Sequence, residues 1–209
     1  MRDPVMSLHK SLAAVVLCGG RSVRMGTDKS ELLIKGESFL SRICRIVGPC
    51  VETTVAVAAQ EQQLSGLPKS VCVVRDTLPD AGPLAGLLSG LEHIRNRKPY
   101  LQHCWVGSCD APFVNARLIG HLLLKCGDKE ATVVRHAGRI QPLGGVYQMK
   151  VLDTVRRLVN SGERRLTELV PNLQAEVVEA KTLRQYDPQL SFLCNVNTPE
   201  DYQRYIVDQ

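Results

Sequence analysis

The sequence is poor in aromatic residues and contains no long apolar run. Only nine of its 209 residues are aromatic: one Trp, five Tyr and three Phe. A membrane-spanning helix needs about 20 consecutive, mostly apolar residues, and the lack of such a run excludes one. The 26 Lys and Arg residues outnumber the 21 Asp and Glu residues by 26 − 21 = 5, but they are scattered along the chain. Nucleic-acid-binding modules concentrate basic residues on one face or supply aromatic side chains for stacking, so neither a nucleic acid nor a membrane is an expected partner.

Paired cysteine spacings are also missing. The eight cysteines include no C-x2-C pair, and most of them lie inside apolar runs such as 71–74. This pattern is typical of small buried side chains in a reducing compartment, so neither a disulfide framework nor a zinc site is expected. The apolar run 12–18 is too short for a secretory signal, and Leu17 is too large for a cleavage site. We therefore expect a cytoplasmic protein whose residues 1–10 form a loose lead-in.

Strand-like and helix-like segments alternate over residues 11–209 without a repeat, a low-complexity tract or a long linker. Strand-like runs occupy 12–17, 53–58, 71–74, 105–107, 131–134 and 176–179. Helix-like segments cover 39–47, a stretch after Gly82-Pro83, 118–123, 150–160, 164–170 and a stretch from Pro199. The glycine-rich segment 138–149 fits either a hairpin or an irregular strand. The alternation predicts one three-layer α/β domain with a mainly parallel sheet and crossover helices.

The first strand runs into a glycine loop that carries basic residues. The run Leu17-Cys18-Gly19-Gly20 ends the strand, and Arg24 and Lys29 follow. Glycines directly after a buried strand let backbone N–H groups approach phosphate oxygens, and Arg and Lys supply compensating charge. The spacing fits neither the dinucleotide pattern G-x-G-x-x-G nor the P-loop pattern G-x-x-x-x-G-K-[ST]. The loop therefore predicts a nucleoside triphosphate site of another kind, and the alternative is a surface turn with solvated basic residues.

A single carboxylate follows a later strand. Asp110 ends the apolar run that begins at Trp105, and Pro112 comes two residues after it. In open α/β sheets ligands bind at the carboxyl ends of the strands, and Mg²⁺ is commonly held by one or two carboxylates together with substrate phosphates. Asp110 is therefore a candidate Mg²⁺ ligand, and the alternative is a cap on the turn before Pro112.

The glycine loop resembles a known signature. Gly19-Gly20-x3-Arg24-Met25-Gly26-x-Asp28-Lys29-x2-Leu32 is similar to the signature loop of MobA-type nucleotidyltransferases, the molybdenum cofactor guanylyltransferases. Later segments match the same family, so the resemblance covers nearly the whole chain: Asp76 with Gly82-Pro83-Leu84-Ala85-Gly86, Cys109-Asp110-x-Pro112, Gly138-Arg139-x-Gln141-Pro142-Leu143 and Asn195-Val196-Asn197-Thr198-Pro199-Glu200.

The resemblance implies a fold, a reaction and a set of site residues. The fold is a three-layer α/β/α, Rossmann-like nucleotide-diphospho-sugar transferase (GT-A-like) fold. In the reaction, a phosphate of molybdopterin attacks the α-phosphorus of GTP, with Mg²⁺ as cofactor and pyrophosphate as the leaving group. The implied catalytic residues are Arg24, Lys29 and Asp110, with Asp110 also the metal ligand. The implied nucleotide-binding residues are Leu17, Cys18, Gly19, Gly20, Lys29, Asp76 and Asp110. The implied substrate-binding residues are Gly82, Gln141, Asn195 and Asn197. A transient complex with other molybdenum-cofactor assembly proteins is implied as well.

The C-terminal motif allows two roles at once. In an extended segment Asn195 and Asn197 point to the same side, where their amides could face the substrate. Thr198 and Pro199 have the residue types of a helix N-cap and of the first helical position.

The chain departs from the family pattern after the second predicted strand. The family has an asparagine there that helps to bind the guanine nucleotide, whereas this chain reads Val57-Ala58-Ala59-Gln60. The base preference is therefore open. A related transferase that uses CTP or another phosphorylated acceptor is the first alternative, and a non-catalytic nucleotide-binding regulator is the second.

Overall fold

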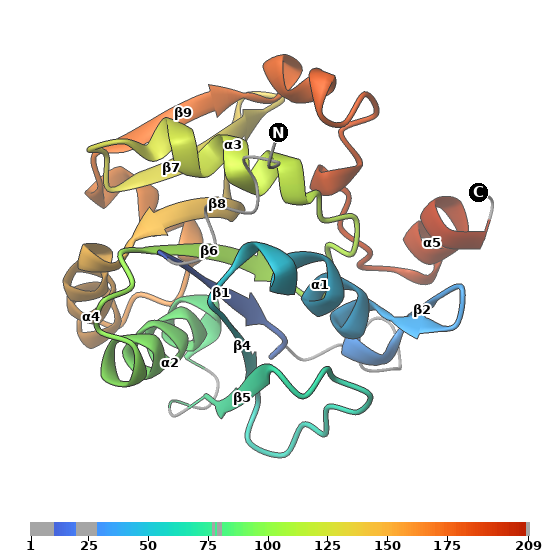
Figure 1. Cartoon of the computed structure of the whole chain (residues 1–209), viewed down its shortest axis with the longest axis horizontal. Coiled ribbons are helices and arrows are strands. Elements are labelled where there is room, and N and C mark those ends of the chain that lie inside the picture. Colours follow the sequence, from blue (N-terminus) through green and yellow to red (C-terminus); the bar gives the residue numbers. More distant parts are fainter. Residues whose placement is uncertain (1–10, 20–28, 77, 79–80, 208–209) are drawn as a thin grey trace.

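A computed structural model of the chain describes residues 11–19, 29–76, 78 and 81–207. Its centre is a seven-stranded sheet with the strand order β5-β4-β1-β6-β8-β7-β9 (Figure 1). The strands are β1 (Leu12–Leu17), β4 (Thr53–Ala58), β5 (Val71–Arg75), β6 (His103–Ser108), β7 (Ala131–His136), β8 (Arg139–Gln148) and β9 (Ala175–Glu179). Every neighbouring pair is parallel except the two pairs made by β8, so the expectation of a mainly parallel α/β sheet is confirmed.

Helices cover both faces of the sheet, which makes the three expected layers (Figure 1). Helices α2 (Gly82–Arg97) and α4 (Leu152–Asn160) lie on one face, and α1 (Phe39–Val47) and α3 (Ala116–Cys126) lie on the other. Strand β1 shows the consequence, because all six of its residues are buried. Val15 and its alternate neighbours pack against α2, whereas Val16 and its alternate neighbours pack against α1. A strand covered on both faces is an unbroken apolar run, as the sequence of β1 is.

The segment 138–149 forms strand β8, which runs antiparallel to β6 and makes a hairpin with β7. The register of β7 with β8 shifts between Thr132 and Val134. Both readings of this segment, hairpin and irregular strand, therefore apply. Since β8 runs opposite to β6, its beginning lies at the same edge of the sheet as the end of β6.

One predicted helix is wrong. The segment 164–170 contains no α-helix but two short 3₁₀ turns, Leu166–Glu168 and Val170–Asn172. Pro171 lacks the N–H that a continuing α-helix needs, and the preceding residues are held in a turn by Glu163.

A small second sheet and the C-terminal helix lie beside the carboxyl end of β1 (Figure 1). Strands β2 (Leu33–Ile34) and β3 (Glu37–Ser38) form a hairpin, and α5 (Pro199–Tyr202) packs against it. The Tyr202 hydroxyl donates to the Leu33 carbonyl at 2.6 Å, and its ring stacks on Phe39 with 6.2 Å between centroids. The hairpin and the C-terminal segment are thus joined by polar and apolar contacts.

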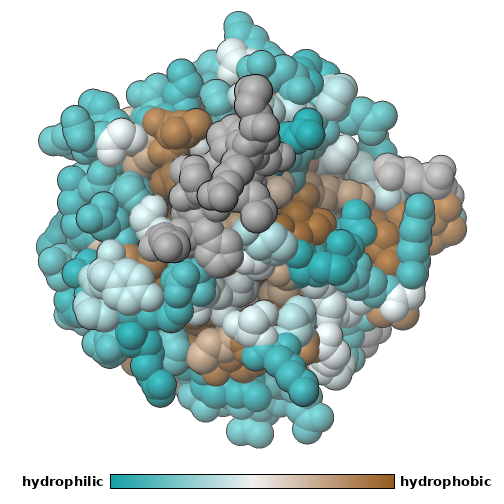
Figure 2. Space-filling model, viewed as in Figure 1, coloured by the Kyte–Doolittle hydropathy of each residue, from teal (hydrophilic) through white to brown (hydrophobic). Residues whose placement is uncertain are grey.

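No helix in the described ranges is long and apolar enough to cross a membrane. On the face drawn in Figure 2 the apolar residues form separate patches between hydrophilic ones. All eight cysteines fall within the described ranges and none is in a disulfide, as their spacing predicts.

Candidate active site

Four parallel strands end at one edge of the sheet, and three backbone hydrogen bonds connect the residues that follow them. The Cys18 N–H donates to the Val57 carbonyl at 2.8 Å, and the Cys109 N–H donates to the Leu17 carbonyl at 3.0 Å. On the other side, the Asp76 N–H donates to the Ala58 carbonyl at 2.8 Å. The sheet therefore brings the beginning of the glycine loop into one row with the segments that carry Asp76 and Asp110.

The glycine loop itself is described only at its two ends. Leu17 and Cys18 are buried, while Gly19 is exposed. A side-chain carbon added at Gly19 would lie 3.5 Å from the Ala59 nitrogen, so the loop passes next to the segment after β4. Gly20 and Arg24 lie outside the described residues. For Lys29 only the backbone is described, at the start of a 3₁₀ turn (Lys29–Glu31).

Gln62, which the sequence did not single out, links three segments of this edge. Its Oε1 accepts the Ala59 N–H at 3.1 Å, and its Nε2 donates to the Cys18 carbonyl at 3.1 Å. The same Nε2 lies 3.4 Å from the Ser30 hydroxyl oxygen. One amide group thus connects the beginning of the glycine loop, the segment after β4 and the turn that follows the loop.

Two further side chains fix the segment after β4, where the family pattern has its asparagine. The Arg75 guanidinium donates to the carbonyls of Ala59, at 2.9 Å, and of Gln62. The Gln60 Nε2 donates to the Asp76 carbonyl at 2.5 Å. Gln60, Gln62 and Arg75 therefore all form hydrogen bonds with backbone groups in and around this segment.

Asp76 is held against the first turns of helix α2. Its Oδ1 accepts the Leu78 N–H at 3.1 Å and lies 3.4 Å from the Ser89 hydroxyl, from which it also accepts. A side-chain carbon added at Gly86 would lie 3.7 Å from the Asp76 Oδ2. The Asp76 carboxylate thus packs against the first two turns of α2, where the small residues Gly86 and Ser89 allow it to come close.

Gly82 begins α2 with a backbone φ of +81°, a conformation that favours glycine. A side-chain carbon there would lie 2.6 Å from the Arg164 carbonyl oxygen, which accepts the Leu84 N–H at 3.3 Å. Glycine is therefore required by both the backbone angle and the close approach of the segment around Arg164.

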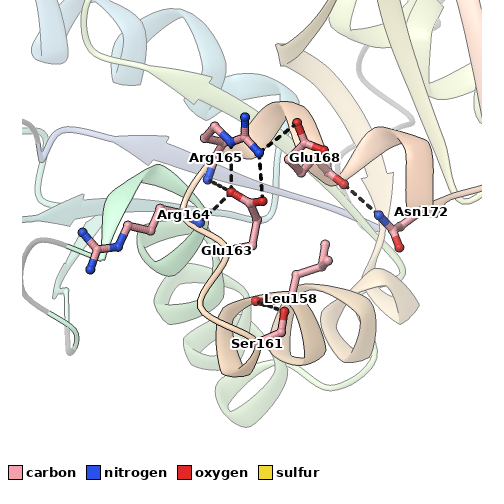
Figure 3. A network of polar contacts seen from close by, with 7 residues as sticks. All are labelled: Leu158, Ser161, Glu163, Arg164, Arg165, Glu168 and Asn172. Carbon is pink, nitrogen blue, oxygen red and sulfur yellow. Dashed lines mark hydrogen bonds and ion pairs between the residues drawn. The ribbon is translucent and has the colours of Figure 1, made fainter.

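The segment against Gly82 is fixed by a carboxylate (Figure 3). The Glu163 Oε1 accepts the N–H groups of Arg164 and Arg165, each at 2.9 Å, and its carboxylate also pairs with the Arg165 guanidinium. These hydrogen bonds, first the one from the Arg165 side chain, lower the pKa of Glu163 to about 2. The Arg164 side chain points away from this network (Figure 3), so the turn presents an exposed guanidinium beside the start of α2.

Asp110 follows β6 and is connected to the C-terminal motif. Its carbonyl accepts the N–H of the fully buried Val196 at 2.8 Å. Asn195 on one side of Val196 is exposed and Asn197 on the other is half-exposed, which agrees with the expected alternation. The helix start is also confirmed, because Thr198 and Asp201 form a capping box at the beginning of α5.

Within the described ranges no three His, Cys, Asp or Glu side chains gather into a metal site. A cation at the carboxyl ends of these strands would therefore have few ligands among the described residues, and the Asp110 carboxylate is the candidate ligand there. That donor set fits Mg²⁺, which prefers oxygen ligands and keeps substrate phosphates and waters in its shell.

A cavity lies next to Asp110 on the face of the sheet that α3 covers. It is formed by the end of β6, the beginning of β8, the start of α3 and the segment 192–195. Its apolar lining includes Trp105 and Phe192, and its amide groups include those of Gln141 and Asn195. Two of the four expected substrate-binding residues therefore line one cavity. Gly82 and Asn197 are not among its lining residues.

The fold and the row of strand ends define an α/β nucleotidyltransferase. A family model described as "MobA-like NTP transferase domain" matches residues 14–177, which is most of the chain. The protein therefore belongs to the MobA-like NTP transferase family, as the glycine loop predicts.

Relatives and a solved structure agree with this assignment. The chain is 28% identical over 198 residues to a probable molybdenum cofactor guanylyltransferase of Carboxydothermus hydrogenoformans, covering 94% of this chain and 96% of that protein. It is 32% identical over 193 residues to a molybdenum cofactor guanylyltransferase of Sinorhizobium fredii, covering 90% and 87%. The crystal structure of molybdopterin-guanine dinucleotide biosynthesis protein A from Archaeoglobus fulgidus superimposes with a TM-score of 0.78 at 26% identity, covering 94% and 97%.

Proposed function

We propose that this enzyme transfers GMP from GTP to a phosphate of molybdopterin, with Mg²⁺ as cofactor and pyrophosphate as the leaving group. The observation that carries the proposal is the row of residues Leu17–Gly19, Asp76 and Asp110 at one sheet edge, directly beside the cavity lined by Gln141 and Asn195. A donor site and an acceptor site must adjoin for a nucleotidyl group to pass between them. The names of the relatives, molybdenum cofactor guanylyltransferases, support a guanine nucleotide as donor and a molybdenum-cofactor precursor as acceptor.

The donor side is the glycine loop and the strand ends next to it. Backbone N–H groups of Gly19 and Gly20, together with Arg24 and Lys29, hold the triphosphate. Leu17, Cys18 and Asp76 are the other proposed nucleotide-binding residues on this side. Asp110 would hold the Mg²⁺, and the chemistry that the ion would supply is neutralisation of charge on the phosphate oxygens.

The acceptor side is the cavity beside Asp110. Its apolar walls suit a flat heterocycle, and the amides of Gln141 and Asn195 offer both donors and acceptors to the polar edge of such a ring. Gly82 and Asn197, the other two predicted substrate-binding residues, do not line this cavity, and Gly82 begins α2 on the opposite face of the sheet.

The chain needs no Ser, Cys or His nucleophile for this reaction. A phosphate monoester is already a competent nucleophile near neutral pH, and its oxygen forms a new P–O bond to the α-phosphorus while the bond to pyrophosphate breaks. The contribution of the protein is in-line positioning and charge neutralisation.

The direct test is pyrophosphate release from GTP when molybdopterin is supplied with Mg²⁺. We expect Asp110→Asn to reduce turnover at least about a hundredfold, because the amide is a poor metal ligand, while the thermal unfolding temperature changes little. Asp128→Asn is the matched control, since Asp128 lies in the turn after α3 at the other edge of the sheet. Turnover by Asp110→Asn equal to that of the control would contradict the assignment of Asp110.

The base preference needs its own test, because Ala58–Gln60 replaces the segment in which the family has an asparagine. A thermal-shift panel of GTP, CTP, ATP and UTP with Mg²⁺ compares the four bases directly. We expect GTP to give the largest shift. A larger shift with CTP would favour a related cytidylyltransferase, and GTP binding without pyrophosphate release would favour a nucleotide-binding regulator.

The proposal also includes a cytoplasmic location and a transient complex with other molybdenum-cofactor assembly proteins. The absence of a disulfide among the eight cysteines, all of which lie in the described ranges, supports a reducing compartment.

A further inference from the structure

Edge strand β5 and helix α2 are joined by two polar contacts. One is the hydrogen bond between Ser89 and Asp76, at the carboxyl end of β5. The other lies one helical turn further from that end, where the Cys72 sulfur is 3.2 Å from the Nε2 of His93. Both partners of the second contact lie outside the proposed donor and acceptor sites.

Cys72 differs from most cysteines of this protein in its surroundings. Six of the eight are buried, and burial raises the pKa of the Cys44 thiol to about 12 and that of Cys104 further still. Cys194 is half-buried, and desolvation raises the pKa of its thiol as well. Cys72 is half-buried on an edge strand, and its sulfur faces an imidazole nitrogen.

His93 is placed to accept a proton from this thiol, because its Nε2 lies 3.2 Å from the Cys72 sulfur. Desolvation lowers the pKa of its imidazole, and the positive charge of Arg97 on the same helix lowers it further. The ring is therefore neutral at neutral pH and offers one nitrogen as an acceptor. A nucleophile within hydrogen-bond reach of a neutral base is the arrangement that activates cysteine thiols.

We propose that Cys72 is a thiol modification site at which this protein forms mixed disulfides with small disulfide compounds, and that His93 is its base. In the exchange, His93 takes the thiol proton and the Cys72 sulfur attacks one sulfur of the small disulfide. A new S–S bond forms to Cys72 and the original S–S bond breaks. The other half leaves as a thiolate and recovers the proton, so no further oxidant is required.

The position of Cys72 gives the modification a consequence, which rests on the proposed function. A group attached to its sulfur must be accommodated between β5 and α2, the two elements that Ser89 and Asp76 connect at the donor site. Displacement of α2 would lengthen that hydrogen bond and move the first turn of the helix. We expect the mixed disulfide to weaken Mg²⁺·GTP binding several-fold.

The first experiment measures the thiol alone. The folded protein is mixed with 5,5′-dithiobis(2-nitrobenzoate), and release of thionitrobenzoate is followed over time. We expect a fast phase of one thiol, which disappears in Cys72→Ser and persists in Cys194→Ser, the matched control at the other half-buried cysteine. A fast phase that survives in Cys72→Ser, or no fast phase at all, would overturn the proposal.

Two variants at His93 test the base. Glutamine keeps a hydrogen-bonding side chain but accepts no proton, so His93→Gln should slow the fast phase at least about tenfold. The thermal unfolding temperature of the variant is measured in parallel. His93→Asn, whose amide side chain is shorter, tests whether the slower labelling depends on the length of the side chain. An unchanged labelling rate in both variants would mean that exposure alone makes Cys72 reactive. It would refute the role of His93.

The coupling is measured separately, so that its failure can be distinguished from failure of the proposed function. The protein is treated with oxidised glutathione, and GTP binding is compared before and after reduction with dithiothreitol, with Cys72→Ser carried through the same steps. Weaker binding that dithiothreitol restores, and that Cys72→Ser does not show, supports the coupling. Equal GTP affinity with and without the adduct refutes it. Absence of GTP binding to the untreated protein instead refutes the proposed function and leaves the labelling result standing.

Discussion

Two glycines of helix α2 provide a sharp test of how closely this helix packs on the sheet. A side-chain carbon added at Gly90 would lie 2.9 Å from both methyl groups of Val15 and 3.1 Å from a methyl of Val57. At Gly86, four residues earlier on the same helix, the nearest atom would be the Leu17 Cδ2 at 3.5 Å. The same substitution, glycine to alanine, therefore meets a clash at one site and ordinary contact at the other.

The expected free energies follow from two opposing effects. Replacing a helical glycine by alanine stabilises a helix by about 1 kcal/mol at either position. At Gly90 the new methyl overlaps β-branched side chains of the central strands, which cannot rotate away, and overpacking of this kind costs about 1–3 kcal/mol. We expect Gly86→Ala to be more stable than the parent by up to about 1 kcal/mol and Gly90→Ala to be less stable by about 0–2 kcal/mol.

Urea unfolding followed by circular dichroism measures both variants on one scale. A difference of about 2 kcal/mol between them corresponds to roughly 4–8 °C in the unfolding temperature for a domain of this size. Equal stability of Gly90→Ala and Gly86→Ala would refute the close packing of α2 on Val15 of β1.

Two further predictions concern polar side chains, Gln62 beside the carboxyl ends of the strands and Glu163 beside the start of α2. Gln62→Ala should raise the KM for GTP and destabilise the fold by about 1–2 kcal/mol, since two well-formed hydrogen bonds to the backbone are lost; Gln63→Ala is the neighbouring control, and equal KM values would refute the role of Gln62. Glu163 has its pKa lowered from 4.5 to about 2, so its contribution to stability is present above pH 4.5 and is lost as the pH falls towards 2. Glu163→Gln should therefore flatten the pH dependence of unfolding in that window, and an unchanged pH profile would contradict the network in Figure 3.

The elements that the sequence predicted well are those with long, simple patterns. Strand β1 has the expected bounds, because six consecutive apolar residues fit a strand covered on both faces. The bounds of α1 are also as expected, since its apolar residues follow one helical face. The segment 164–170 was wrongly predicted as a helix because its two arginines and two leucines have helical propensity. Glu163 and Pro171 impose turns there that the spacing of the apolar residues does not indicate.

The candidate site was predictable where a residue follows a strand directly. Asp76 and Asp110 stand at the ends of apolar runs, so the topology of a parallel sheet alone places them at one edge. The cavity lined by Gln141 and Asn195 required more, because the two residues are far apart in the sequence and meet only through the reversed strand β8 and the segment after residue 190.

Gln62 shows why part of such a site is invisible in one sequence. It lies in a polar segment with three other glutamate or glutamine side chains within two residues of it, and nothing local distinguishes it from them. Its importance comes from the sheet, which places the carbonyl of Cys18 and the N–H of Ala59 within reach of a single amide. A missing asparagine after β4 therefore does not mean an empty position. Gln62 accepts from the Ala59 N–H, Arg75 donates to the Ala59 carbonyl and Gln60 donates to the Asp76 carbonyl. Under the proposed function, a nucleotide base bound beside this segment would meet these fixed peptide groups. If the base is selected by these peptide groups, its selection depends on the backbone geometry that Gln62 helps to fix. Gln62→Ala should therefore raise the KM values for GTP and CTP and also change their ratio.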